Sequence, residues 1–349
     1  MDFAPLDTLD YRIVNALQIH PRISWADLST VLSTDATTLS RRWSRMTERG
    51  VAWSGCFYMP IERQRRQPLS FVEIRCDPNE LDAVVSTLVE IPSVFSLHGT
   101  SGDRQLYATV GDASIADIDR CVREQIATIP GVRDTRVHYV RRVFQEGGQW
   151  RLSALTDAQR TTIAAGRPST PPGLAAEPTD DQWGVLDALG DDVRRPLSAV
   201  QARVGGSLAA ASRRVGALLG ADWAHWRIEV AHRALGYDCA VMLWLRAPQD
   251  KLEQVATSFR LVPDSRLIAS VTGPSNLVIS LWIRDLDDLD ALEERVAKVY
   301  PQLTFTDVWV IPHVYKRAGS VLDRNGLHDH HVRFDESASV VSGRARSLE

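Results

Sequence analysis

The stretch "TDATTLSRRWSRMTERG", residues 34–50, decides how the fold is interpreted. Asp35 is a residue type that caps helix N-termini, and Leu39, Trp43 and Met46 then recur at helical spacing. The opposite face is rich in arginine and opens with two threonines. This pattern predicts an amphipathic helix whose apolar face joins a small core and whose basic face is exposed.

Two more short helices are predicted before this one. Asp7 and Ser24 are suitable caps, and leucine, isoleucine and valine residues follow each of them at helical spacing. Three short helices with a tight second turn form a helix-turn-helix module, whose third helix enters the major groove of DNA. Double-stranded DNA is therefore the expected partner. The alternative is a solvated surface helix that binds nothing.

Residue types along the third helix indicate separate roles in DNA binding. Hydroxyl and guanidinium groups at its start suit base edges, and the later arginines suit phosphates. We expect base contacts from Thr37, Thr38 and Arg41, and phosphate contacts from Arg42, Arg45 and Arg49. The basic residues at 63–66 are expected to add non-specific attraction.

The chain repeats itself once. At a shift of 172 positions, "RISWADLSTVLSTDATTLSRRW" (22–43) aligns without a gap with "RRPLSAVQARVGGSLAAASRRV" (194–215). Arg213 and Arg214 keep the arginine pair of the first copy, whereas alanines replace its threonines. The second module is therefore predicted to be a degenerate reader. It either serves mainly in packing or contacts phosphates through Arg194, Arg195, Arg213 and Arg214.

Each copy continues with strand and helix patterns in the order βαββαβ. In the first copy the expected elements are 70–76, 79–91, 93–100, 105–111, 114–129 and 132–144. This order predicts a split βαβ fold, with two helices on one face of a four-stranded antiparallel sheet. The other sheet face is free, and we expect it to pair with the equivalent module of the same chain.

The arrangement resembles the Lrp/AsnC family of feast/famine transcription regulators. The resemblance is carried by "LDTLDYRIVNALQIHPRISWADLSTVLSTDATTLSRRWSRMTERGVA" (6–52) and "PSVFSLHGTSGDRQLYATV" (92–110), and with the second copy it extends to residue 317. It implies a DNA-binding regulator whose sensor modules pair through their sheets. It also implies an effector, an amino acid or another small metabolite, bound near the glycine loop between the middle strands.

The resemblance places the effector site on two equivalent loops, at Thr100, Gly102, Asp103 and Gln105, and at Thr272, Gly273, Ser275 and Asn276. The family usually carries an acid where this chain has Gln105 and Asn276. An amide lacks the charge that holds an ammonium group strongly. The alternative for both loops is a β-turn whose glycine supplies a positive φ.

The predicted fold class is α+β, with two winged-helix-like helix-turn-helix domains and two ferredoxin-like βαββαβ sensor domains. The segment 164–178 is rich in Pro, Gly and Ala, which is linker composition. The predicted ranges are 1–52 for the first helix-turn-helix domain, 53–149 for the first sensor domain, 150–178 for a linker, 179–226 for the second helix-turn-helix domain, 227–317 for the second sensor domain and 318–349 for a flexible tail.

Composition limits the remaining possibilities. The 349 residues carry a formal net charge of -4, so DNA binding depends on a local basic patch. No apolar run approaches the roughly 20 residues that span a bilayer, no signal peptide is visible, and four widely separated cysteines suit a reducing cytoplasm. We expect a cytoplasmic homodimer without cofactor, metal or membrane partner, and we interpret "HDHH" (328–331) as incidental.

Sirohaem decarboxylases are the alternative class, because they join the same two domain types and some are two-copy fusions. Such an enzyme needs histidine and other polar groups on the strands that face a tetrapyrrole. In the stretches "SVFSLHGT" (93–100) and "RLIASVTG" (266–273), only His98 is available, and it has no basic or histidine companion in the second copy. We therefore expect a regulator and not an enzyme.

Overall fold

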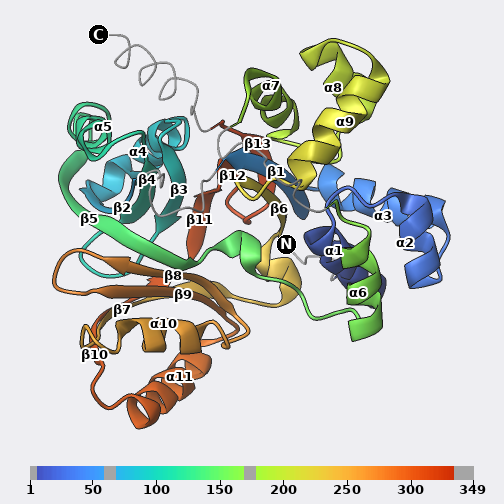
Figure 1. The fold of residues 1–349 in the computed structure, drawn as a ribbon. Helices are drawn as coiled ribbons and strands as arrows, with labels where there is room; N and C mark the ends of the chain where they lie inside the picture. The colour runs from blue at the N-terminus through green and yellow to red at the C-terminus, as the bar shows by residue number, and fades with distance from the viewer. Residues whose placement is uncertain (1–5, 59–67, 169–177, 334–349) are drawn as a thin grey trace. The chain divides into compact units, whose positions relative to one another are not determined.

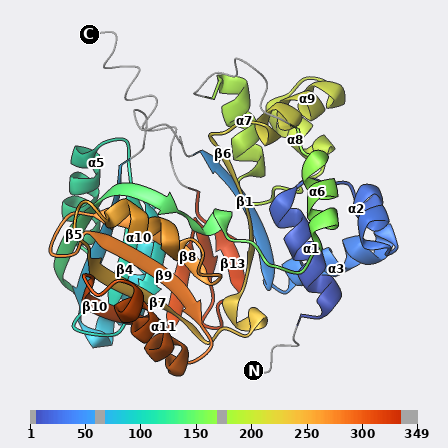
Figure 2. The same ribbon diagram turned by 60° about the horizontal axis from the view of Figure 1, so that its bottom comes forward.

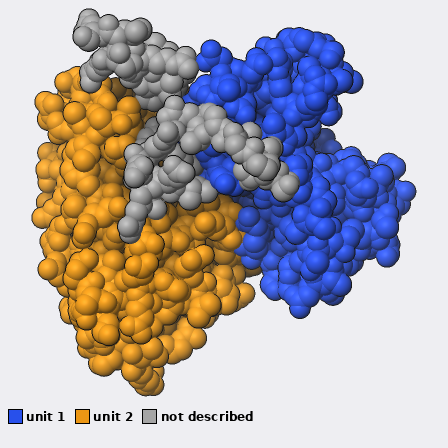
Figure 3. All heavy atoms as spheres, viewed as in Figure 1, with its two compact units in different colours: residues 1–66, 151–231 blue, residues 67–150, 232–349 orange. Residues whose placement is uncertain are grey.

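The computed structural model describes residues 6–58, 68–168 and 178–333. The chain forms two compact units, Met1–Arg66 with Arg151–Ala231, and Gln67–Trp150 with His232–Glu349 (Figure 3). The first unit contains both helix-turn-helix modules, and the second contains both sensor modules. Each unit therefore combines the corresponding parts of the two copies.

The first helix-turn-helix module, head one (residues 6–50), has the predicted three helices. They are α1 (Thr8–Ile19), α2 (Trp25–Leu32) and α3 (Ala36–Glu48). Asp7, Ser24 and Asp35 cap them, each accepting hydrogen bonds from backbone N–H groups of the first turn. The capping residues chosen from the sequence are confirmed, because each supplies the oxygen that an open helix N-terminus needs.

The second module, head two (residues 178–222), repeats this arrangement. Its helices are α7 (Asp180–Leu189), α8 (Leu197–Val204) and α9 (Leu208–Leu219). Thr179 forms a capping box with Gln182, and Ser207 caps α9. Gly205 and Gly206 join α8 to α9 with φ values of 71° and 81°, a conformation that favours glycine.

A strand follows each head, and the two strands pair with each other. β1 (Ala52–Tyr58) and β6 (Ala224–Val230) form an antiparallel ribbon in which Gly55 lies opposite Arg227 (Figure 2). Because these two residues are equivalent in the repeat, the ribbon has a local pseudo-two-fold axis at its centre. Each strand pairs with its counterpart in the other copy. The strands of a wing, in contrast, would fold back on their own head.

The predicted linker, 150–178, contains a helix, and this part of the prediction is wrong. α6 (Asp157–Ala165) starts at a capping box formed by Thr156 and Gln159, and packs on α1 and α2. Its Ile163 is buried, and the Gln159 side chain donates to the Val31 carbonyl at 3.1 Å. One buried isoleucine in a short polar sequence is too weak a pattern to identify this helix without its partner surface.

Both sensor modules have the predicted βαββαβ order (Figure 1). Sensor one (residues 68–145) consists of β2 (Leu69–Cys76), η1 (Pro78–Glu80), α4 (Leu81–Val89), β3 (Val94–Gly99), β4 (Leu106–Gly111), α5 (Ile115–Arg120), the π-helix η2 (Cys121–Ile126) and β5 (Val132–Gln145). Sensor two (residues 239–311) consists of β7 (Cys239–Arg246), α10 (Leu252–Phe259), β8 (Ser265–Val271), β9 (Leu277–Ile283), α11 (Leu286–Val299) and β10 (Thr304–Ile311). The short helices η3 (Gly147–Gln149) and η4 (His232–Leu235) lie outside the two modules.

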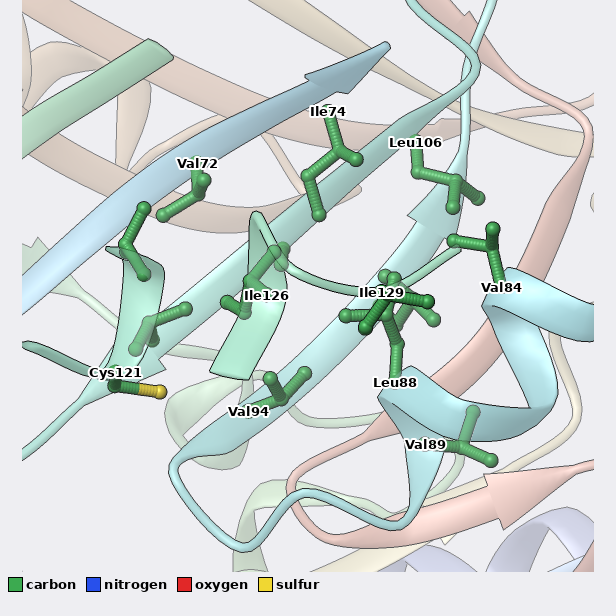
Figure 4. Packing of buried hydrophobic residues seen from close by; sticks show 14 of the residues in the cluster. Val72, Ile74, Val84, Leu88, Val89, Val94, Leu106, Cys121, Ile126 and Ile129 are labelled. Atoms are coloured by element: carbon green, nitrogen blue, oxygen red, sulfur yellow. The ribbon is translucent and has the colours of Figure 1, made fainter. Parts of the chain in front are cut away.

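Each sensor has its own apolar core between its helices and one face of its sheet. In sensor one, Val72, Ile74 and Leu106 on the strands meet Val84 and Leu88 on α4 (Figure 4). Sensor two has an equivalent core around Val241, Leu243, Ile279, Val255 and Leu292. The period-two and helical patterns in the sequence correspond to these inward faces.

The two sensors exchange strands reciprocally. The second half of β5 leaves sensor one and pairs with β8 of sensor two. In the same way β11 (His313–Arg317), which follows β10 after Pro312, pairs with β3 of sensor one. The resulting sheet has the order β10-β7-β9-β8-β5-β2-β4-β3-β11-β12-β13.

The flexible tail predicted at 318–349 is wrong for its first part. β12 (Ser320–Leu322) and β13 (His328–His331) extend the sheet beyond β11, and Val321 joins the core of sensor one. "HDHH" is therefore β13, whose backbone pairing was not visible in its polar composition. In the described ranges no helix is long and apolar enough to cross a membrane.

Candidate nucleic-acid interface and effector loops

The third helix of head one has the two faces that its sequence predicts. Leu39, Trp43 and Met46 are buried against α1 and α2, while Thr37, Arg41, Arg45 and Arg49 are exposed and Thr38 is half-buried. Among the described residues, Arg41, Arg45 and Arg49 have no ion-pair partner. They form a cationic surface that is not neutralised by the protein itself.

Arg42 is a correction to the predicted phosphate contacts. Its guanidinium lies 2.5 Å from the Asp7 carboxylate and 3.0 Å from that of Asp10. These hydrogen bonds raise the pKa of Arg42 above its ordinary value. The side chain ties α3 to the start of α1, so its charge is already used within head one.

Head two shows the same difference between its two arginines. Arg213 is exposed, whereas Arg214, the counterpart of Arg42, pairs with Asp181 at 2.8 Å and donates to the carbonyls of Val204 and Gly205. Arg214 thus joins α9 to α7 and to the α8–α9 turn. The predicted phosphate contact at Arg214 is corrected for the same reason as that at Arg42.

Arg194 and Arg195 are also engaged within the protein. Arg194 donates to the carbonyls of Pro21 and Ile23 at 2.8 and 3.1 Å, and its guanidinium stacks 4.0 Å from the Trp25 ring centroid. Burial lowers the pKa of Arg194 to about 10. Arg195 donates to the Ala188 carbonyl and pairs with Asp191. Neither fits the phosphate contact that the sequence suggested.

Arg22, which was not among the predicted site residues, is the counterpart of Arg194. It donates to the carbonyls of Val193 and Arg195 at 2.5 and 3.1 Å. The alignment of Arg22 with Arg194 in the repeat was the available signal, but only the pairing of the heads explains it. The basic residues 63–66 lie outside the described residues.

The effector loops join the two sensors through a residue that the sequence did not single out. Ser101 donates its N–H to the Val310 carbonyl at 2.9 Å, and its hydroxyl accepts from the Val310 N–H at 2.9 Å. Thr272 makes the same two bonds, each 2.9 Å, with Tyr139 of sensor one. The predicted Thr100 instead donates to a carbonyl of its own loop.

The two amides that replace the acid of the family are bound to backbone. The Gln105 side chain accepts from the Cys76 N–H at 2.9 Å. Asn276 accepts from the Ala247 N–H at 2.9 Å and donates to the Ala247 carbonyl at 2.8 Å. Both residues therefore extend the ends of β2 and β7. The Gln105 oxygen and both polar side-chain atoms of Asn276 thus have backbone partners, and the effector contact expected at these two residues stays a prediction.

The glycines adopt the turn conformation of the alternative interpretation. Gly102 and Gly273 have φ values of 96° and 118°. A Cβ atom on Gly273 would lie 3.0 Å from Nδ1 of His138, and Ser275 shares a hydrogen bond of 2.6 Å with Thr306. The loop of sensor two is thus packed against neighbouring side chains, and Thr272, Gly273 and Ser275 have clear structural roles there.

Asp103 belongs to a charged network centred on Arg104. The buried Arg104 guanidinium lies 2.6 Å from Glu73, 2.7 Å from Asp103 and 3.1 Å from Asp307 of sensor two, and 4.1 Å from the Trp309 ring centroid. His138 also contacts Glu73 at 2.7 Å. Burial opposes ionisation of Glu73, but its bond to His138 and the charge of Arg104 keep its pKa below the ordinary value.

A polar hollow of about 240 Å³ lies beside this network on sensor one. It is lined by Glu73, Arg75, Asp103, Asp134 and Arg136. Only Asp103 was predicted from the sequence. The other four lie on β2 and β5, which are distant in sequence. Their alternating charges indicate a shared site only when these two strands are known to be neighbours.

The fold and these sites define a class: helix-turn-helix heads joined to ferredoxin-like sensor modules. Two family models match the chain, the AsnC-type helix-turn-helix domain at residues 6–47 and the Lrp/AsnC ligand binding domain at residues 69–150. Residues 6–47 and 69–150 thus carry the two domain types of the Lrp/AsnC family, and the second half repeats their architecture in tandem.

Relatives and solved structures agree with a two-copy architecture. An uncharacterized HTH-type transcriptional regulator of Pyrococcus abyssi is 24% identical over 142 residues, which are 41% of this chain and 90% of that protein. The leucine-responsive regulatory protein of Haemophilus influenzae is 27% identical over 138 residues, 39% of this chain and 83% of that protein. The crystal structure of the siroheme decarboxylase NirDL shares the fold, with a TM-score of 0.57 and 14% identity over 98% of this chain and 99% of that one.

Proposed function

We propose that this protein is a sequence-specific DNA-binding transcription regulator of the Lrp/AsnC type, acting in the cytoplasm, in which head one is the main reader. The observation that carries the proposal is the exposed face of α3, where Thr37, Arg41, Arg45 and Arg49 stand over a buried apolar stripe. Arginines without an ion-pair partner, on a helix that fits the major groove, favour phosphate and base contacts. When such arginines bind phosphates, the counterions of the DNA are released, which favours association.

Head two is proposed as the weaker of the two readers. The N-terminal turn of α9 exposes Leu208 and Ala209, which have no hydrogen-bonding groups for base edges. Of the two adjacent arginines on α9, Arg213 and Arg214, only Arg213 is exposed. Head two therefore adds phosphate or methyl contacts, while sequence readout is concentrated in head one.

The pairing of two unlike heads in one chain suggests an asymmetric DNA site. The β1–β6 ribbon and the bonds of Arg22 and Arg194 fix head one relative to head two. A symmetric operator would require two chains, each contributing its head one to a half-site. We propose that such a homodimer forms on palindromic DNA.

Selection of genomic fragments bound by the full-length protein, followed by footprinting, tests the proposal. We expect one enriched motif with one strongly specified half-site and one weakly specified half-site. A palindromic motif bound by two chains, measured by mass photometry, would support the homodimer. Absence of any enriched motif at physiological salt would overturn sequence-specific binding.

We further propose that a small metabolite, such as an amino acid, modulates DNA binding. The leucine-responsive regulatory protein is named for such a response. In the present chain the mixed-charge hollow beside Asp103 supports this proposal, while the packed loop of sensor two does not. A thermal-shift screen of small metabolites tests it, and no response to any of them would favour a purely structural sensor pair.

A tetrapyrrole enzyme is the second candidate, favoured by the whole-length likeness to NirDL and by one cluster. The His98 ring is half-buried and lies near Arg317, and its desolvation, together with the charge of Arg317, lowers the pKa of His98 to about 3. The pKa of the buried His232 is also lowered, by burial and then by the charge of Arg317. His98 thus has companions from the C-terminal half, contrary to our expectation.

The aromatic packing between the sensors speaks against that candidate. Phe71 and Tyr107 of sensor one and Trp244 and Trp309 of sensor two are almost fully buried and contact one another between the two sensors. Incubation with sirohaem, followed by absorbance spectroscopy, separates the two functions. A Soret band that survives gel filtration would support the enzyme and contradict a pure regulator.

A further inference from the structure

We propose that Leu208, the first residue of α9, makes head two recognise thymine through the C5-methyl group that this base exposes in the major groove. The inference rests on the proposed DNA-binding function and deepens it. It assigns to the second head one residue, one base and a mode of recognition that uses no hydrogen bond.

Leu208 is a large apolar side chain in contact with solvent. It is 50% exposed, and among the described residues of the two heads it is the only large apolar side chain that is exposed. Its equivalent in head one, at the shift of 172 positions, is the small Ala36. Single exposed leucines are common on protein surfaces, so the position of Leu208 on α9 carries the argument.

Four exposed side chains lie on one side of α9. They are Leu208, Ala209, Ser212 and Arg213. At about 100° per residue, these four positions fall within an arc of about 140° around the helix axis. Their equivalents in α3 include Thr37 and Arg41, the two exposed residues for which base contacts are expected. Leu208 therefore belongs to the side of α9 that corresponds to the DNA-facing side of head one.

Small residues surround Leu208 at this end of head two. The stretch 205–211 reads "GGSLAAA", so Leu208 is its only side chain longer than a hydroxymethyl group. Gly205 and Gly206 form the preceding turn, and a Cβ atom on Gly205 would meet no other atom within 4 Å. The edge of a base pair can therefore come close to the start of α9, where Leu208 reaches farthest outward.

The chemistry of the leucine side chain selects one feature of the major groove. Donors and acceptors dominate the base edges there, and the C5-methyl group of thymine is the apolar exception. Leucine placed over a donor or acceptor would remove its water without replacing the hydrogen bond. Leucine placed against the methyl group removes apolar surface of both partners from water. Arg213, which is exposed, remains available for a neighbouring phosphate.

Recognition of a single methyl group gives only modest discrimination. Burial of one such group changes affinity by about fourfold. Head two should therefore favour thymine at one position and specify little else. This agrees with a DNA site in which one half-site is strongly specified and the other weakly.

Fluorescence anisotropy with a genomic fragment enriched by the full-length protein tests the inference. Each thymine in the footprinted region is replaced singly by deoxyuridine, which lacks only the methyl group. We expect one replacement in the weakly specified half-site to weaken binding by about fourfold. In Leu208→Ala the same replacement should cause no further loss, because the partner of the methyl group is absent. Any thymine read by head one should respond equally in both proteins.

Two further variants act as controls. Leu208→Met keeps a flexible apolar side chain of similar size, so it should keep the response to deoxyuridine. Leu261→Ala is the matched control, because Leu261 is 83% exposed and belongs to sensor two. It should bind both DNA forms as the unmodified protein does. Circular dichroism spectra that match the unmodified protein show that the variants are folded.

Three results would overturn the inference. The first is that no thymine responds to the loss of its methyl group, and the second is that Leu208→Ala leaves every such response unchanged. The third is unchanged DNA affinity with weaker self-association of Leu208→Ala in mass photometry, which would place Leu208 in an interface between chains. In all three cases sequence-specific binding persists and the proposed function stands. If the protein enriches no fragment, the proposed function fails and the inference fails with it.

Discussion

Arg22 and Arg194 are equivalent residues of the two copies, and each donates hydrogen bonds to the two carbonyls that flank the other. Arg22 binds the carbonyls of Val193 and Arg195, and Arg194 binds those of Pro21 and Ile23. The two heads are thus joined by one symmetric set of contacts close to the β1–β6 ribbon.

Loss of this contact should destabilise the first unit. Arg22→Ala leaves the carbonyls of Val193 and Arg195 without their donor, at a cost of about 1.5–3 kcal/mol for bonds to a charged group. Hydrogen exchange of the β1 and β6 amides measures the change, since the ribbon lies in the same unit. Arg133→Ala is the exposed control. Exchange rates unchanged in Arg22→Ala would show that the hydrogen bonds of Arg22 contribute nothing to the stability of the ribbon.

DNA affinity should depend more on head one than on head two. The double variant Arg41→Ala, Arg45→Ala should lose roughly 1–3 kcal/mol for each base contact removed. Arg213→Ala, on the second reader helix, should lose less. Fluorescence anisotropy with a selected DNA fragment at physiological salt gives both values. An equal or larger loss for Arg213→Ala would reverse the ranking of the heads.

The Arg42 contact with α1 should show a defined pH dependence. Arg42→Ala should reduce the stability of head one by about 1 kcal/mol near neutral pH, because its ion pairs with Asp7 and Asp10 are lost. Partial burial opposes ionisation of Asp7, but the Asp10 N–H and Arg42 lower its pKa below 3.8. A carboxylate with a lowered pKa stabilises the fold above pH 3.8 and loses this effect as pH falls through the folded value.

The difference between the unmodified protein and Arg42→Ala should therefore shrink on acidification below pH 3.8. Hydrogen exchange of the α1 and α3 amides, measured at several pH values, follows this difference. A difference that stays constant down to the acid limit would mean that Arg42 acts through packing of its aliphatic part.

The two amides of the sensor loops should respond differently to replacement by acids. Asn276→Asp removes the donor to the Ala247 carbonyl and places a carboxylate against it, at a cost of about 1–3 kcal/mol. Gln105 only accepts a bond, from Cys76, so Gln105→Glu keeps that interaction. Thermal unfolding should show a lower Tm for Asn276→Asp than for Gln105→Glu. Equal values would contradict the distinct roles of these side chains.

Local patterns in the sequence were sufficient for the elements and for the repeat. Asp7, Ser24 and Asp35 were identified as caps because helix capping depends on residues within one turn. The alternating stretches gave the strands for the same reason, and the 172-residue shift showed that the fold occurs twice. The exposed arginines of α3 were also predictable, because helical spacing separates them from Leu39, Trp43 and Met46.

Tertiary structure alone decided which charges are available. Arg41 and Arg42 are neighbours of the same type in the sequence, yet only Arg42 meets the carboxylates of α1. Arg194 appeared to be a phosphate ligand until the pairing of the heads placed it against Pro21 and Ile23. The hollow of sensor one likewise exists only because β2 and β5 are adjacent. Whether a charged group has a partner depends on residues that are distant in the chain. The spacing of residues within one segment does not show where those distant residues lie.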